Sequence, residues 1–145
     1  MKKKLYIVLS TLIGAFFLIQ LVPFRVSNPS TRQEPKWDSP RTRQLAVAAC
    51  YDCHSNETKP EWYSKIAPVS WWLKGHVDDG RAALNFSEWN TNRGEGAHNA
   101  AETISDGSMP PSYYTWFGLH RAAKLTKAEQ DELIRGLRKT IGGGR

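Results

Sequence analysis

The apolar positions of the chain are concentrated in one stretch near its start. Residues 5–24 contain no charged side chain, and Lys2, Lys3 and Lys4 precede them. As a helix rising about 1.5 Å per residue, this stretch would reach about 30 Å, the thickness of the hydrocarbon core of a bilayer. The pattern predicts one transmembrane helix within residues 1–24, with the lysines in the cytoplasm and the rest of the chain outside. A cleaved signal peptide is the alternative, but the stretch is longer than a usual signal core and no A-x-A-like site follows it.

The next segment, residues 25–40, is polar and interrupted by prolines. Pro29, Pro35 and Pro40 lie among Ser, Asn, Thr and Gln residues. This composition predicts an extended linker that holds the remaining domain, residues 41–145, away from the membrane.

Helical periodicity dominates the remaining domain. A helical segment is expected over the alanine-rich residues 41–50, and a second helix over residues 68–86, which place apolar side chains on one face. A polar loop is expected over residues 87–95, followed by a short helix over residues 97–104. The last helix has the clearest start, because Thr126 and Glu129 have the spacing of a capping box. Its buried stripe is expected to contain Leu133, Ile134 and Leu137. No segment alternates apolar and polar residues convincingly, so we expect an all-α fold.

The positive charge of the chain does not indicate a nucleic-acid partner. The formal net charge is +6, but Lys2, Lys3, Lys4 and Arg25 lie beside the apolar stretch, and the remainder holds 16 basic and 14 acidic residues. No cluster of Lys and Arg with interleaved aromatic residues is present, so we expect no nucleic-acid binding.

The strongest chemical signal is the sequence C-x-x-C-H formed by Cys50, Cys53 and His54. This is the attachment motif of c-type haem. Two intervening residues let one helical turn present both thiols to the two vinyl groups of one haem. The following histidine then lies under the porphyrin plane, where its imidazole reaches the iron. The motif predicts one covalently attached haem c with His54 as an iron ligand.

Three other interpretations of the two cysteines fit less well. A structural zinc site needs four ligands, commonly from two cysteine pairs, and the chain has only two cysteines. A thioredoxin-like redox pair should follow a strand and open a helix, whereas an alanine-rich helical segment precedes Cys50. A plain disulfide between Cys50 and Cys53 is possible outside the cytoplasm but gives His54 no role.

A second axial ligand is expected for a haem that only carries electrons, and it is often a methionine. Beyond Met1 the only methionine is Met109, which is followed by Pro110 and Pro111. The two prolines prevent a helix and favour an extended segment that could lay the thioether across a haem face. Met109 is therefore the predicted second ligand, and the alternative is that it fills the core as most methionines do.

His76 is the other candidate for the second ligand. It lies between Trp72 and Gly80 on the apolar face of the helix predicted for residues 68–86, so its side chain should point inward. It could be a core residue, a hydrogen-bond donor to a haem propionate, or an iron ligand in a bis-histidine site. His98 and His120 are weaker candidates. The abundant aromatic residues downstream of the motif are expected to pack around the cofactor.

Several short blocks of the sequence agree with those of one bacterial family. They are C-x-x-C-H-S-N-E-T at 50–58, Trp62-Tyr63, A-P-V-S-W-W at 67–72, His76-Val77, Gly80-Arg81, L-N-F-S-E-W at 84–89, Met109-Pro110-Pro111, Tyr113, His120 and A-x-L-T at 123–126. On these blocks the chain resembles the small bacterial haem-binding domain family of c-type cytochromes, over roughly residues 40–140. The resemblance implies a cytochrome c-like helical fold and a membrane-tethered protein that faces the periplasm. Arg121 departs from the pattern, because relatives often have proline after this histidine.

These features predict a mono-haem cytochrome that passes single electrons to a redox partner protein. It would be tethered to the bacterial cytoplasmic membrane, with its haem domain on the periplasmic side. The sequence contains no catalytic triad, phosphate-binding loop or second cofactor motif, so we expect a carrier and not an enzyme. One alternative is a peroxidase, or a gas or redox sensor, with a labile sixth ligand. There, His76 and Arg81 would act as distal acid/base and charge-stabilising groups. A haem-bearing interaction module without turnover is a further possibility.

Overall fold

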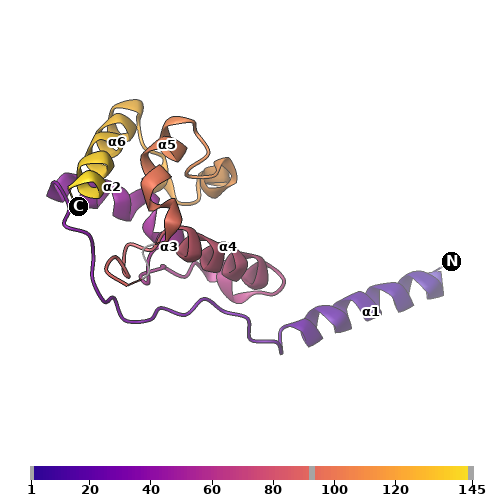
Figure 1. Ribbon diagram of the computed structural model, residues 1–145. Coiled ribbons are helices and arrows are strands. Elements are labelled where there is room, and N and C mark those ends of the chain that lie inside the picture. The colour runs from indigo at the N-terminus through magenta and orange to yellow at the C-terminus, as the bar shows by residue number, and fades with distance from the viewer. Residues whose placement is uncertain (1, 92–93, 144–145) are drawn as a thin grey trace.

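The computed structural model describes residues 2–91 and 94–143, and α-helices and short 3-10 helices form its regular structure (Figure 1). The α-helices are α1 Lys2–Ile19, α2 Pro40–Ala49, α3 Tyr51–His54, α4 Val69–Ala83, α5 Ala100–Ser105 and α6 Lys127–Gly142. The 3-10 helices are η1 Trp62–Lys65, η2 Glu95–Asn99, η3 Ser112–Gly118 and η4 Arg121–Ala123. These residues contain no strand beyond an isolated bridge between Gln33 and Glu88. The all-α prediction is confirmed. Residues 1, 92, 93, 144 and 145, which fall within the expected anchor, loop and domain, lie outside the described residues.

Local sequence signals account for the starts of two helices. Ser39 precedes α2, its hydroxyl accepts a hydrogen bond from the Thr42 amide, and Pro40 occupies the first helical position, where no amide hydrogen is needed. At α6 the predicted capping box is confirmed. The Thr126 hydroxyl accepts from the Glu129 amide, and the Glu129 carboxylate accepts from the Thr126 amide.

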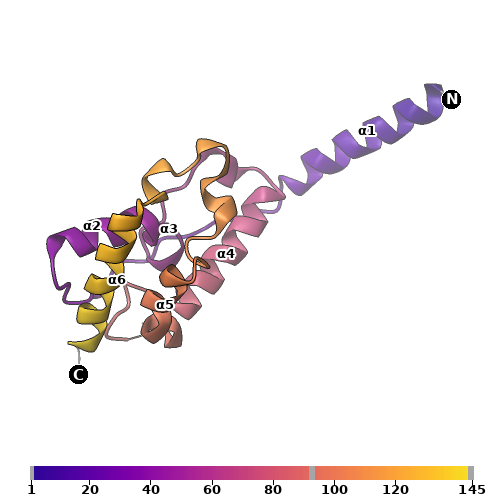
Figure 2. The ribbon, with the colours of Figure 1, turned by 90° about the horizontal axis from the view of Figure 1, so that it is seen from above.

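The apolar core lies where α2, α5 and α6 meet, and Figures 1 and 2 both place α6 beside α2 and α5. The predicted stripe of α6 is buried there. Helices α6 and α2 approach closely at Gly136, where a Cβ would collide with the Thr42 side chain of α2. The ring of Phe86 stacks on Tyr51 with centroids 5.6 Å apart, so the core extends to the turn that carries the two cysteines.

Helix α1 differs from the predicted transmembrane helix. It begins within the three lysines and ends at Ile19, whereas the apolar stretch continues to Phe24. Pro23 lacks an amide hydrogen and disfavours helical backbone at the residue before it, which explains the early end. In residues 2–91 and 94–143, no helix combines the length and apolar character that a membrane crossing requires. The prediction of a spanning helix over residues 5–24 is therefore not supported.

The chain that follows α1 runs along the domain. The Gln20 side-chain amide bonds reciprocally to the backbone of Ala67, with N–O distances of 2.9 and 3.0 Å. The Arg81 guanidinium donates to the Ser27 carbonyl, and the Asn28 side chain donates to the Thr58 carbonyl at 2.8 Å. Residues 25–39 contain no helix, as expected for a proline-rich segment, but these contacts show that they are not a free spacer.

Candidate functional site

The C-x-x-C-H motif forms a single tight turn. Cys50 ends α2 by donating from its amide to the Ala46 carbonyl, and α3 then spans Tyr51–His54. The amides of Cys53 and His54 both donate to the Cys50 carbonyl, at 3.2 and 2.9 Å. This one turn brings Cys50, Cys53 and His54 to the wall of the same cavity. The structure therefore brings the three predicted side chains together at one cavity.

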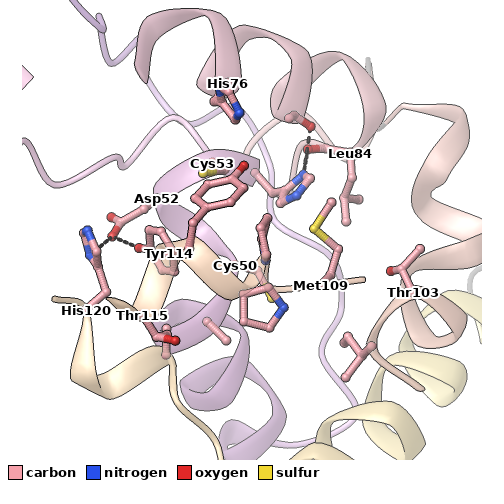
Figure 3. Close-up of a pocket in the computed structure, with 18 of the residues that line it drawn as sticks. Cys50, Asp52, Cys53, His76, Leu84, Thr103, Met109, Tyr114, Thr115 and His120 are labelled. Atoms are coloured by element: carbon pink, nitrogen blue, oxygen red, sulfur yellow. Dashed lines mark hydrogen bonds and ion pairs between the residues drawn. The ribbon is translucent and has the colours of Figure 1, made fainter. Parts of the chain in front are cut away.

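The cavity has a volume of about 1120 Å³, just above the range of about 300–1000 Å³ that is usual for ligand pockets. Its wall is predominantly apolar. Among the residues that line it are Leu73 and Val77 of α4, Leu133 and Leu137 of α6, and Trp72 and Trp116. Figure 3 shows Cys50, Cys53, His76 and Met109 around this space. A large flat apolar cofactor fits such a space better than a metal ion or a small polar ligand does.

His54 is held in the tautomer that a metal ligand requires. Its Nδ1 lies 2.8 Å from the Gly80 carbonyl oxygen and 3.1 Å from the Leu84 carbonyl oxygen. Because carbonyls only accept hydrogen bonds, Nδ1 carries the proton, and Nε2 keeps its lone pair. Burial lowers the pKa of His54, although the two carbonyls act in the opposite direction. The imidazole is therefore neutral at pH 7 and available to bind iron through Nε2.

Gly80 allows α4 to approach this turn. A Cβ at residue 80 would lie 2.5 Å from the Cys53 carbonyl oxygen, which is too close for both to remain in place, and 3.2 Å from the Cys53 Cβ. The same close packing brings the Gly80 carbonyl to His54. The glycine in the family block His76-Val77 to Gly80-Arg81 thus has a steric reason.

We expect Gly80→Ala to lower the free energy of unfolding by about 1–3 kcal/mol, the usual cost of overpacking, and to reduce haem incorporation. Gly75→Ala is a matched control on the same helix, because a Cβ at residue 75 meets nothing within 4 Å. The control should be neutral or up to about 1 kcal/mol more stable. Urea unfolding and the haem absorbance per protein provide the two measurements. Equal behaviour of the two variants would show that the close approach at Gly80 is unimportant.

The environment of the cysteines argues against a redox-active thiol pair. Burial raises the pKa of Cys50 to about 12. Burial, together with the Asp52 carboxylate, raises the pKa of Cys53 to about 11. Reactive thiols in C-x-x-C redox motifs have lowered pKa values, so these two thiols lack the property that such chemistry needs. The cysteines are also not joined to each other in a disulfide.

Met109 lies at the cavity, and its surroundings differ from those of a core methionine. The residue is 39% exposed, and Figure 3 shows its side chain directed into the cavity near Leu84 and Thr103. The Met109 amide and the Ser108 hydroxyl both donate to the Thr103 carbonyl of α5, at 2.9 and 3.0 Å. The backbone of this loop is therefore fixed, while the thioether faces the space that a cofactor would occupy.

His76 also lines the cavity and is only half-buried, so it is not the core residue that one interpretation of the sequence expected. Its Nδ1 donates to the Trp72 carbonyl at 3.0 Å, which leaves Nε2 with a free lone pair. The ring packs against Trp72 and Tyr113 with centroids 4.1 and 5.8 Å away. Met109 and His76 are thus both placed at the cavity, and the choice of the sixth ligand stays a prediction.

Arg81 does not take the distal position that the peroxidase alternative gives it. It is not among the residues that line the cavity. Its guanidinium donates to the carbonyls of Ser55 and Ser27 and to the side chains of Asn28 and Thr58. Two of these four hydrogen bonds hold residues 27–28 against the domain, and the charge-stabilising role of Arg81 at the cavity is not supported.

Sequence reasoning missed a hydrogen-bonded group at the cavity wall, which we call the Asp52 cluster: Asp52, Tyr63, Tyr114 and His120. The Tyr114 hydroxyl donates to Asp52 Oδ2 at 2.6 Å, and His120 Nδ1 lies 3.6 Å from the same oxygen. The Tyr63 hydroxyl is 2.7 Å from His120 Nε2, and the rings of Tyr114 and His120 stack with centroids 4.0 Å apart. Burial, followed by the hydrogen bond to Asp52, raises the pKa of Tyr114, so its hydroxyl remains a donor. The only sequence signals were Tyr63 and His120 in the family blocks, and neither indicated a partner.

The comparison with known families agrees with this geometry. A sequence model described as the haem-binding domain matches residues 14–139, which is most of the chain. No curated protein and no solved structure shows significant similarity. The match extends from α1 to α6 and includes every residue of the cavity wall described above. The chain belongs to the haem-binding domain family.

Proposed function

We propose that the chain binds one haem covalently through Cys50 and Cys53, with His54 as an iron ligand, and that it carries single electrons. The observation that supports this most is the placement of all three side chains on one large apolar cavity, with the Nδ1 proton of His54 bound to backbone carbonyls. A bound haem would supply reversible one-electron iron chemistry. The residues of this chain would hold it and orient His54.

A carrier is favoured over an enzyme because both candidate sixth ligands lie at the cavity. Met109 and His76 each present an uncommitted donor atom there, whereas Arg81 is bound elsewhere. A site with both axial positions filled leaves no open position for a substrate. The alternative of a peroxidase or a gas or redox sensor keeps one supporting observation, the free Nε2 of His76, which could act as a distal base.

The absorption spectra of the haem-loaded wild-type chain test this proposal. We expect low-spin, six-coordinate spectra in both oxidation states, a reversible one-electron redox titration, and little change when carbon monoxide is added to the ferrous protein. Rapid and complete binding of carbon monoxide would show an open or labile sixth position. The carrier proposal would then give way to the sensor or peroxidase alternative.

We also propose that α1 tethers the haem domain to the bacterial cytoplasmic membrane, on the periplasmic side, where it meets a redox partner protein. No α1 side chain is buried against the domain, and its apolar residues from Leu5 to Phe17 are exposed. Such a surface needs an apolar environment. The lysines at its start favour the cytoplasmic side for that end.

Charged substitutions in α1 test the tether. The triple variant Leu9→Asp, Leu12→Asp and Phe16→Asp should move the full-length chain from the membrane fraction to the soluble fraction. Each aspartate is expected to cost about 2.5–3.5 kcal/mol in the middle of a membrane-inserted helix. The haem spectrum serves as an internal control and should not change, because no α1 residue lines the cavity. Wild-type chain that is soluble, or that carbonate releases from membranes, would contradict a stable tether.

A further inference from the structure

The Asp52 cluster joins parts of the chain that are far apart in sequence. Asp52 lies between the two cysteines of the attachment turn, Tyr63 lies in η1, and Tyr114 lies in η3. His120 immediately precedes η4. The Asp52 carboxylate is itself fixed, because its other oxygen accepts from the Lys59 amide at 3.0 Å. The cluster therefore ties the segment of η3 and η4 to the turn that holds Cys50 and Cys53.

This tie acts on the loop that carries Met109. Only Pro110 and Pro111 separate Met109 from η3, and the Tyr114 amide donates to the Pro111 carbonyl at 2.9 Å. On the other side, the Met109 amide is bound to the Thr103 carbonyl of α5. The methionine is thus held between two anchors, α5 behind it and the Tyr114–Asp52 hydrogen bond ahead of it. Figure 3 shows Tyr114 and Met109 on the same cavity, with Asp52 and His120 beside Tyr114.

The backbone at His120 gives a separate sign that this segment is held in place. His120 has φ +46°, in the left-handed region, and it is the only non-glycine residue among those described with positive φ. Histidine tolerates this conformation better than most residues, but it persists only where the surroundings fix it. The stacking on Tyr114 and the Tyr63 hydroxyl supply that constraint. A proton on His120 Nδ1 faces Asp52, and Nε2 then accepts from Tyr63.

We propose that the Asp52 cluster is a latch that sets how firmly Met109 occupies the sixth position of the haem iron. The proposal rests on the proposed function and on Met109, the second ligand predicted from the sequence, as the sixth ligand. When an external ligand enters, the iron–sulfur bond breaks and a bond to the external ligand forms, with no electron transferred. For the loop that carries Met109 to move away from the iron, the hydrogen bond between Tyr114 and Asp52 must break. The latch therefore lowers the population of the open form that an external ligand needs.

Imidazole binding to the ferric haem-loaded chain measures that open population. Tyr114→Phe removes the hydroxyl but keeps the ring that stacks on His120. We expect it to raise the apparent affinity for imidazole about ten-fold or more, the factor for losing a hydrogen bond to a charged group. Tyr51→Phe is the matched control, since it makes the same chemical change one residue from Asp52. The Tyr51 hydroxyl is buried near the Glu34 carboxylate, and neither residue lines the cavity or belongs to the Asp52 cluster, so its loss should leave imidazole affinity unchanged.

Each outcome of this experiment decides the question. Equal imidazole affinity in wild type, Tyr114→Phe and Tyr51→Phe, with the iron–thioether absorption band present in all three, overturns the latch but leaves the proposed function intact. If the wild type lacks that band, Met109 is not the sixth ligand, and the coordination of the iron by His54 and Met109 is refuted instead of the latch. If Tyr114→Phe does not take up haem, Tyr63→Phe replaces it, because among the described residues the Tyr63 hydroxyl bonds only to His120. A several-fold rise in its affinity supports the latch, and wild-type affinity overturns it.

Discussion

Replacing both Cys50 and Cys53 by alanine should leave no haem bound after denaturation, because in the proposed attachment each thiol forms one thioether bond. Each single variant should retain at most one bond and give a weaker signal. Denaturing electrophoresis with a haem peroxidase stain measures this directly, on protein produced together with a c-type maturation system. The buried, protonated state expected for both thiols means that spontaneous attachment outside such a system should be slow.

Tyr51→Phe provides a control for the covalent attachment, since it changes a residue inside the motif without touching a thiol. It should keep the full signal. Loss of haem from the denatured wild type would show that the attachment is not covalent. Retention of haem by the double cysteine variant would show that other side chains hold it.

Replacing Met109 by alanine should remove the weak sulfur-to-iron charge-transfer band from the red end of the ferric spectrum. It should also lower the reduction potential, because a thioether favours reduced iron relative to imidazole, and it should open the iron to carbon monoxide. The half-exposed position of Met109 means that its truncation leaves little cavity in the core, so the change in the spectrum will not arise from unfolding.

The matching variant is His76→Ala, which removes the other candidate at the same cavity. It should leave the charge-transfer band in place, because in this proposal His76 is not an iron ligand. Its ring packs on Trp72 and Tyr113 beside the haem. The opposite pattern, in which His76→Ala loses six-coordination and Met109→Ala changes nothing, would establish a bis-histidine site.

Features encoded by residues close in sequence were predictable. The capping box of α6 needs only Thr126 and Glu129, and the motif turn needs only Cys50 to His54. Helix α4 was expected over residues 68–86 and spans Val69–Ala83, because its apolar face and its start after Pro68 are both local signals. The all-α class follows from the same periodicity.

Features that depend on contacts between distant segments were not predictable. Asp52 and Tyr114 are 62 residues apart, and nothing in either local sequence indicates that they share a hydrogen bond. Arg81 lies on the same helix as His76, but it points to residues 27–28 instead of the cavity, and a helical pattern alone did not reveal that partner. The end of α1 was misplaced because hydropathy continues past Ile19, whereas the backbone responds to Pro23.

The hydrogen bonds that fix the chain after α1 have a consequence for how the haem domain would meet the redox partner proposed above. If residues 25–40 were a free flexible linker of 16 residues, its ends would be separated by roughly 20–24 Å on average, and the domain could sweep that volume in all directions. With α1 held at a membrane, as proposed, the contacts of Gln20 with Ala67 and of Arg81 with Ser27 remove most of this freedom. The domain would then behave as a fixed arm. Electron exchange would depend on the partner's diffusion and on a single orientation of the haem edge, so the encounter rate should be insensitive to the length of this segment.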